Sequence, residues 1–152
     1  MNSLPKSHWL RGLALVAFLT LAYYATYLVK QLSPPPTGSV DFRTDEATAL
    51  AEAKASGKPV LIDFTAEWCG ACRELDEQVF SHPDVRERLK AFVPLRLDVT
   101  AEGPESLALL QKYGVVSLPA ILFVDRNGKV LEKPRVSGLL TPDEFLTVIS
   151  GL

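Results

Sequence analysis

The two cysteines of the chain, Cys69 and Cys72, are the residues whose type and spacing best suit chemistry. Only two residues separate them, so they can bond to each other but cannot link distant parts of a fold. A buried strand is expected before them and a helix after them, where free backbone N–H groups and the helix dipole would stabilise a thiolate on Cys69. Cys72, one turn later, can then attack a mixed disulfide formed by Cys69. The pair predicts thiol–disulfide exchange, with half of a metal site and an inert structural bridge as the alternatives.

Composition and charge argue against other classes of function. A structural zinc site needs about four ligands, and besides the cysteines the chain has only two histidines, His8 and His82. Residues 33–152 carry 13 basic and 18 acidic side chains, and this negative excess is unlike a nucleic-acid-binding surface. The sequence therefore predicts no metal and no cofactor other than a redox-active disulfide between the cysteines.

The N-terminal part of the chain resembles a membrane anchor in composition. The uncharged run from residue 12 to residue 29 is rich in Leu, Ala, Val, Phe and Tyr, and as a helix it would be about 27 Å long, just enough to cross a bilayer. Lys6 and Arg11 precede the run and residues 1–32 hold no acid, so residues 1–11 should stay in the cytoplasm. We expect a transmembrane signal anchor over residues 12–30. A cleaved signal peptide and a buried core helix are the alternatives, although the run lacks a good cleavage site and a polar face.

Residues 31–39 are expected to form a proline-rich linker. Residues 40–152 are expected to form a single domain in which helices and strands alternate. Helices are expected to begin near Thr44 as N-cap, at Ala71 with an extent of 71–80, and near Pro83 and Gly103. A further helix should begin at Thr141, where Thr141 and Glu144 predict a capping box. The expected strands are 59–64, 92–99, 120–124 and 129–131, the last two joined by a hairpin at Asn127-Gly128. This order predicts an α/β fold with a central mixed sheet covered by helices on both faces.

The segment VLIDFTAEWCGACR at residues 60–73 resembles the active-site region of the thioredoxin family. Leu118-Pro119 matches the cis-proline site of that family, and the resemblance covers residues 40–152. Within the family, the insert at 80–84 and the stretch 97–101 are most similar to the C-terminal reductase domain of the DsbD thiol:disulfide interchange proteins. Ala71 differs from the proline that thioredoxin itself carries there. The resemblance implies a thioredoxin-like fold.

The resemblance also implies a role for each matching residue. Cys69 would be the attacking thiol, Cys72 the resolving thiol, and Asp63 a buried carboxylate that takes a proton from Cys72. The alternative for Asp63 is a strand-end residue bound to backbone. A cis peptide bond before Pro119 would let the neighbouring backbone pair with an extended client peptide. The residues expected to contact substrate are Trp68, Gly70, Ala71, Leu118 and Pro119.

These features predict a protein-disulfide reductase that acts on exported proteins or apocytochromes, as in cytochrome c maturation. The acids Asp63 and Glu67 lie close in sequence to Cys69 and oppose a thiolate there, which favours a reductant. We expect the domain on the periplasmic side of a bacterial inner membrane, held there by the N-terminal helix. Because the expected anchor contains no cysteine, a separate membrane protein should supply electrons. The alternatives are a thiol oxidase or disulfide isomerase of the same fold, and a tethered non-catalytic binding or chaperone module.

Overall fold

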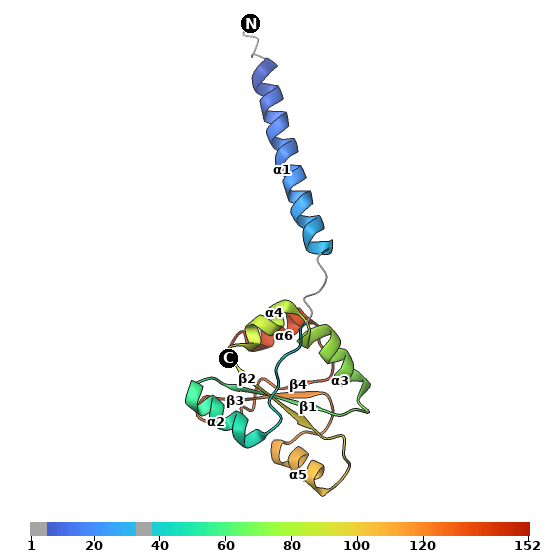
Figure 1. Cartoon of the computed structure of the whole chain (residues 1–152), viewed down its shortest axis with the longest axis vertical. Coiled ribbons are helices and arrows are strands. Elements are labelled where there is room, and N and C mark those ends of the chain that lie inside the picture. Colours follow the sequence, from blue (N-terminus) through green and yellow to red (C-terminus); the bar gives the residue numbers. More distant parts are fainter. Residues whose placement is uncertain (1–5, 33–37) are drawn as a thin grey trace. The chain divides into compact units, whose positions relative to one another are not determined.

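The computed structural model describes residues 6–32 and 38–152 of the chain (Figure 1). It divides into two compact units, Met1–Pro35 and Pro36–Leu152. Residues 1–5 of the predicted cytoplasmic segment and residues 33–37 of the predicted linker lie outside the described residues. The described residues thus form one helix in the first unit and one folded domain in the second.

The first unit contains helix α1 (Lys6–Leu32), so the apolar run is helical as expected. The side chains described in it, those of residues 12–28, are all exposed. A membrane-spanning helix needs about 20 consecutive, predominantly apolar residues. Over the described part of the chain, no helix is long and apolar enough to meet that requirement. The structure therefore does not support the predicted transmembrane helix over residues 12–30.

The second unit is built on a four-stranded sheet with the order β2-β1-β3-β4. Strand β1 (Val60–Thr65) runs parallel to β2 (Val93–Asp98) and antiparallel to β3 (Ala120–Val124), while β4 (Val136–Ser137) pairs antiparallel with β3. The sheet is thus mixed, as predicted. Its central strand β1 is buried along almost its whole length, which explains its nearly continuous apolar sequence.

Helices cover both faces of the sheet (Figure 1). On one face lie α2 (Glu46–Ser56) and α5 (Pro104–Tyr113), which pack against the β1 side chains Ile62 and Phe64. The other face carries α3 (Gly70–Leu75), the π-helical turn η1 (Asp76–Phe80), α4 (Pro83–Leu89) and α6 (Pro142–Ile149). Alternate residues of β1 therefore belong to two separate hydrophobic clusters.

Local sequence determines where several helices begin. Thr141 and Glu144 form the predicted capping box at the start of α6. For α2 the predicted cap, Thr44, is wrong: the side chain of Asp45 accepts a hydrogen bond from the Thr48 N–H at 2.7 Å. The Asp45 carboxylate, one residue further along, satisfies one of the free N–H groups, and its negative charge is stabilised by the positive end of the helix dipole.

Two elements differ from the sequence prediction. The helix expected over residues 71–80 is α-helical only to Leu75 and continues as η1, so its second half follows a wider turn. The expected strand at 129–131 makes a single bridge, from Val130 to Val124, and β4 is the segment that pairs with β3. At that turn the Asp125 carboxylate accepts hydrogen bonds from the N–H groups of Asn127 and Lys129, which favours a side-chain-stabilised turn over a longer hairpin.

Candidate active site at Cys69 and Cys72

Cys69 and Cys72 form a disulfide at the start of α3, with their Cα atoms 5.2 Å apart. Cys69 is the N-cap of that helix, and its Sγ accepts a hydrogen bond from the Cys72 N–H at 3.1 Å. Both residues are buried, with 7% of Cys69 and 4% of Cys72 exposed. The two cysteines are therefore bonded to each other at the strand-to-helix junction, as expected. The Cys72 N–H is also in place to stabilise a thiolate on Cys69 after reduction.

Thr100, which the sequence did not single out, hydrogen-bonds to the loop before the disulfide. The hydroxyl of Thr100 accepts a hydrogen bond from the Glu67 N–H at 2.8 Å, and its carbonyl accepts one from Trp68 Nε1 at 3.3 Å. Arg73 donates to the Glu67 carbonyl at 3.1 Å. Thr100 follows β2 and the loop follows β1, so the parallel pairing of these two strands brings them together.

Asp63 is buried, as expected, but its partner is a side chain. It is 2% exposed, and Arg96 donates from Nε to its Oδ2 at 2.8 Å. The alternative interpretation, a strand-end residue bound to backbone, is therefore not what the structure shows. Arg96 was not singled out in the sequence, yet Asp63 and Arg96 are direct partners in the β1–β2 register. The only indication in the sequence is a basic residue amid the apolar positions of a predicted strand.

The guanidinium of Arg96 is shared with a second acid, Asp76 at the start of η1. Arg96 donates from Nη1 to Asp76 Oδ2 at 3.2 Å and from Nη2 to Asp76 Oδ1. Burial raises the pKa of Asp63 to about 6, an effect that the charge and hydrogen bond of Arg96 oppose and the charge of Asp76 reinforces. A carboxyl group with a pKa of about 6 exchanges its proton near neutral pH, as a general base must. Within the described residues, no hydrogen bond joins Asp63 to either cysteine.

We expect Asp63 to make the stability of the fold depend on pH. Its pKa is raised from 3.8 to about 6 in the folded chain, so its contribution is complete below pH 3.8 and is lost as the pH rises through about 6. Asp63→Asn removes this dependence. From pH 5 to pH 7.5, the free energy of unfolding of the unchanged protein should therefore fall by about 1–3 kcal/mol relative to that of the variant, which is the variant's gain. Urea unfolding at both pH values measures the gain, with the exposed Asp84→Asn as control; a gain no larger than the control's contradicts the prediction.

The peptide bond between Leu118 and Pro119 is cis, as expected. Pro119 is buried, and its carbonyl accepts a hydrogen bond from the Gly138 N–H at 3.1 Å. Of the other residues expected to contact substrate, Gly70 is exposed and Ala71 is half-buried against the core. Gly70 and Ala71 lie between the two cysteines in sequence, and Gly70 is open to solvent.

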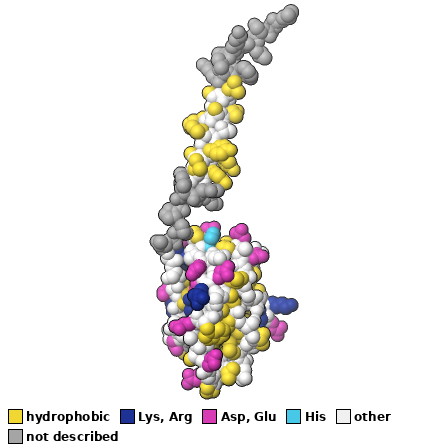
Figure 2. Space-filling view, turned by 90° about the vertical axis from the view of Figure 1, so that its right-hand side faces the viewer, with side chains coloured by type: hydrophobic (Ala, Val, Ile, Leu, Met, Phe, Trp, Pro, Cys, Tyr) yellow, Lys and Arg dark blue, Asp and Glu magenta, His cyan; other side chains and the backbone are white. Residues whose placement is uncertain are grey.

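A pocket of about 520 Å³ lies between Trp68 and Leu118, two of the residues expected to contact substrate. Leu107, Val116 and Glu102 also line this pocket. Trp68, Leu107 and Val116 are 60%, 58% and 98% exposed, an unusual degree for large apolar side chains that line one pocket. Figure 2 shows hydrophobic side chains gathered on one face of the domain with acidic side chains around them. The pocket therefore presents exposed apolar side chains to solvent.

The described residues offer no alternative chemistry based on a metal. Within them, no group of three or more His, Cys, Asp or Glu side chains is arranged to hold an ion. The nearby acids, Asp63 and Asp76, are both engaged by Arg96. The disulfide is therefore the redox group that the site contains.

Comparison with known proteins gives a consistent result. A family model described as a thioredoxin-like domain matches residues 47–151. The thiol:disulfide interchange protein DsbD of Vibrio cholerae is 36% identical over 95% of this chain, and that of Haemophilus ducreyi is 33% identical over 93%. The alignments cover 26% of either relative, so this chain spans about a quarter of their length.

Solved structures show the same similarity. The oxidised C-terminal domain of Neisseria meningitidis DsbD is 30% identical, with a TM-score of 0.58, and the match covers 70% of this chain and 94% of that one. A thioredoxin from Thermus thermophilus is 31% identical, with a TM-score of 0.60, over 72% of this chain and 84% of that one. The family match at residues 47–151 lies within the second unit, which carries the disulfide.

Proposed function

Because the chain belongs to the thioredoxin-like family, we propose that it is a thiol:disulfide oxidoreductase that reduces disulfides of other proteins through Cys69 and Cys72. The observation that carries this proposal is the disulfide at the strand-to-helix junction, with its Cys72 N–H bound to Cys69 Sγ and an apolar pocket beside Trp68. A client segment that lies in the pocket would present its own disulfide to the pair.

The proposed reaction has two steps. The Cys69 thiolate attacks one sulfur of the client disulfide, which forms a mixed disulfide and releases the other client sulfur as a thiolate. Cys72 then loses its proton and attacks Cys69 Sγ, which closes the Cys69–Cys72 disulfide and releases the second client thiol. The client gains two electrons and the cysteine pair loses them. In this scheme Asp63 accepts the proton of Cys72, and its pKa of about 6 suits that task.

The direction of the reaction is proposed from the charges around the site. Asp63 and Asp76 share the single guanidinium of Arg96, so this cluster carries a net negative charge when both acids are ionised. Negative charge opposes a thiolate, and a dithiol whose thiolate is not stabilised is a better reductant. The similarity to DsbD proteins supports thiol–disulfide interchange at this pair.

We expect the reduction potential of the Cys69–Cys72 pair to lie nearer the thioredoxin value of about −270 mV than the strong-oxidant value of about −120 mV. Equilibration of the full chain with glutathione buffers measures it, and Cys72→Ser, which cannot form the disulfide, is the control. A value above about −160 mV would reassign the protein as a thiol oxidase.

The proposed setting is the periplasm, with residues 40–152 as the redox domain. The clients would be exported proteins or apocytochromes that carry a disulfide, and electrons would come from a separate membrane protein. The similarity to DsbD supports this setting. Oxidised and reduced forms of the pair can be distinguished by alkylation in intact cells; a pair that remains reduced when the supply of electrons to the periplasm is removed would contradict it.

A further inference from the structure

The segment that leads into the redox domain, residues 38–43, lies along the outer edge of β2, and we call it the lead-in segment. The Arg43 N–H donates to the Pro94 carbonyl at 2.8 Å, and the Arg96 N–H donates to the Arg43 carbonyl at 2.8 Å. These two bonds form a parallel bridge between Arg43 and Leu95. The backbone of the lead-in segment is therefore bound directly to Arg96, the partner of Asp63.

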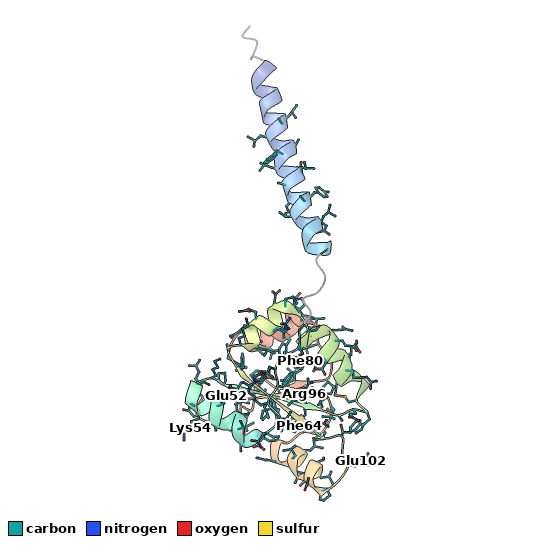
Figure 3. All side chains as sticks on the ribbon, viewed as in Figure 1. Glu52, Lys54, Phe64, Phe80, Arg96 and Glu102 are labelled. Carbon is teal, nitrogen blue, oxygen red and sulfur yellow. A yellow bond between two sulfur atoms is a disulfide. The ribbon has the colours of Figure 1, made fainter. Side chains whose placement is uncertain are left out.

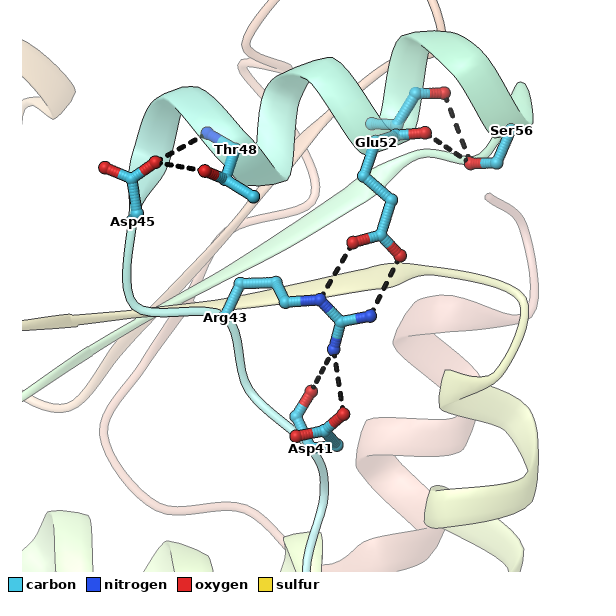
Figure 4. A network of polar contacts seen from close by, with 7 residues as sticks. Asp41, Arg43, Asp45, Thr48, Glu52 and Ser56 are labelled. Atoms are coloured by element: carbon cyan, nitrogen blue, oxygen red, sulfur yellow. Dashed lines mark hydrogen bonds and ion pairs between the residues drawn. The ribbon is translucent and has the colours of Figure 1, made fainter.

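A side-chain network holds the lead-in segment in this position (Figure 4). Arg43 donates from Nε and Nη2 to the two carboxylate oxygens of Glu52, at 2.8 and 2.9 Å. It also donates from Nη1 to the Asp41 carbonyl at 2.9 Å. A two-pronged contact of this kind fixes orientation as well as distance. The segment is thus attached both to the sheet and to α2.

Phe42, between these attachments, covers the guanidinium of Arg96. Its ring centroid is 4.1 Å from Arg96 Cζ, and that of Phe80 is 5.9 Å away. The two rings meet edge to face, with centroids 5.2 Å apart. Phe80 and Arg96 also lie together in the stick view (Figure 3). The guanidinium of Arg96 therefore has the Phe42 ring over one face, while its Nε donates to Asp63 and its Nη atoms donate to Asp76.

Solvent and Asp76 both compete with Asp63 for the guanidinium of Arg96. A surface pocket of about 240 Å³, lined in part by Phe42, Asp76 and Arg96, gives solvent access to this side of the cluster. Asp76 is the second competitor, because it accepts hydrogen bonds from the same guanidinium. The charged groups facing Asp63 are Arg96 on β2 and Asp76 on η1. The nearby charges of the lead-in segment are engaged with each other and with Glu52.

We propose that Phe42 is a positioning residue that holds Arg96 against Asp63 and so controls how readily that carboxylate takes up a proton. The ring stabilises the guanidinium in one place through a cation–π contact on one of its faces. The consequence for resolution of the mixed disulfide rests on the proposed function. The effect on Asp63 itself does not.

The test is the titration of the Asp63 carboxyl carbon by NMR in the full chain, with the disulfide closed so that neither cysteine titrates. Arg96 lowers the pKa of Asp63, so loosening it in Phe42→Ala should raise the midpoint by roughly 0.5–1 pH unit, the size expected for one cation–π contact. Phe42→Leu, which keeps apolar volume, should give the same direction of shift if the Ala variant folds poorly. Phe42→Tyr, which keeps the ring, should restore the midpoint.

Two further variants make the result specific. Asp76→Asn should shift the midpoint downward, because it removes a like charge and leaves Arg96 to Asp63. Phe92→Leu removes a buried ring whose centroid lies 5.5 Å from Arg88 Cζ, and it should leave the midpoint unchanged. An unchanged midpoint in both Phe42→Ala and Phe42→Leu, or an equal shift in Phe92→Leu, overturns the proposal.

The pH dependence of mixed-disulfide resolution distinguishes this inference from the proposed function. In Phe42→Ala the profile should move up by the same amount as the titration midpoint. A shifted midpoint with an unchanged kinetic profile supports the positioning of Arg96 but removes Asp63 from the proposed reaction. A shifted kinetic profile with an unchanged midpoint overturns the role of Phe42.

Discussion

Replacing Cys72 by serine should turn the protein into a covalent trap for its clients and its electron donor. Cys69 keeps its capping position at the start of α3 and can still attack a disulfide, but no thiol remains to resolve the adduct. Mixed disulfides should therefore accumulate, and multiple-turnover reduction of a model disulfide such as insulin should fall by at least roughly a hundredfold. Cys69→Ser should lose activity to the same extent and trap almost nothing.

Non-reducing gels of cells that express each variant, with an alkylating agent in excess at lysis, separate these outcomes. The double variant, Cys69→Ser with Cys72→Ser, gives the background of adducts that do not involve the pair. If Cys69→Ser traps partners and Cys72→Ser does not, the two roles are reversed. If neither folded variant traps a partner, thiol–disulfide exchange is not the function, and a binding or chaperone module becomes the better hypothesis.

Asp63→Asn should slow resolution of the mixed disulfide by roughly 10- to 100-fold at pH 7 and leave the initial attack nearly unchanged. The reason is that the carboxylate is proposed to take the proton of Cys72, whereas Cys69 is stabilised by the backbone at the start of α3. Single-turnover stopped-flow measurements can follow both steps through the fluorescence of Trp68, which neighbours Cys69 in sequence. Equal slowing of both steps would leave Asp63 with a structural role only.

Arg96→Gln is the matched comparison for this experiment. It keeps the Asp63 carboxylate but removes the group that lowers its pKa, so Asp63 should be protonated at pH 7 and ionised only at higher pH. Resolution in Arg96→Gln should therefore be slow at pH 7 and recover as the pH rises, whereas in Asp63→Asn it should stay slow. Identical profiles for the two variants would argue that both act through a general loss of packing.

The sequence was most informative where structure depends on neighbouring residues. The junction at Cys69, the capping box at Thr141 and the buried strand 120–124 each follow from a short pattern, and the structure confirms all three. The cis bond at Pro119 was expected from the resemblance to thioredoxin and is also present. The predicted roles of the site residues remain predictions until the variants are measured.

Interactions between distant residues could not be predicted in the same way. Asp63 and Arg96 are 33 positions apart, and their contact depends on the register of two parallel strands. Asp76 meets Arg96 from a π-helical turn, and helical periodicity does not distinguish that turn from a regular helix. The pairing of β3 with β4 in place of 129–131 likewise depends on a turn in which a side chain competes for backbone N–H groups.

The bridge between Arg43 and Leu95 also has a consequence for how the protein behaves at high concentration. An uncovered strand edge offers unpaired N–H and C=O groups to other molecules and promotes aggregation. Here the lead-in segment occupies part of the outer edge of β2, and the opposite edge strand, β4, is only two residues long. The family match begins at residue 47, so a fragment trimmed to that match would lose this cover. Such a fragment would expose β2 to intermolecular strand pairing, and a soluble version of the redox domain should begin no later than residue 38.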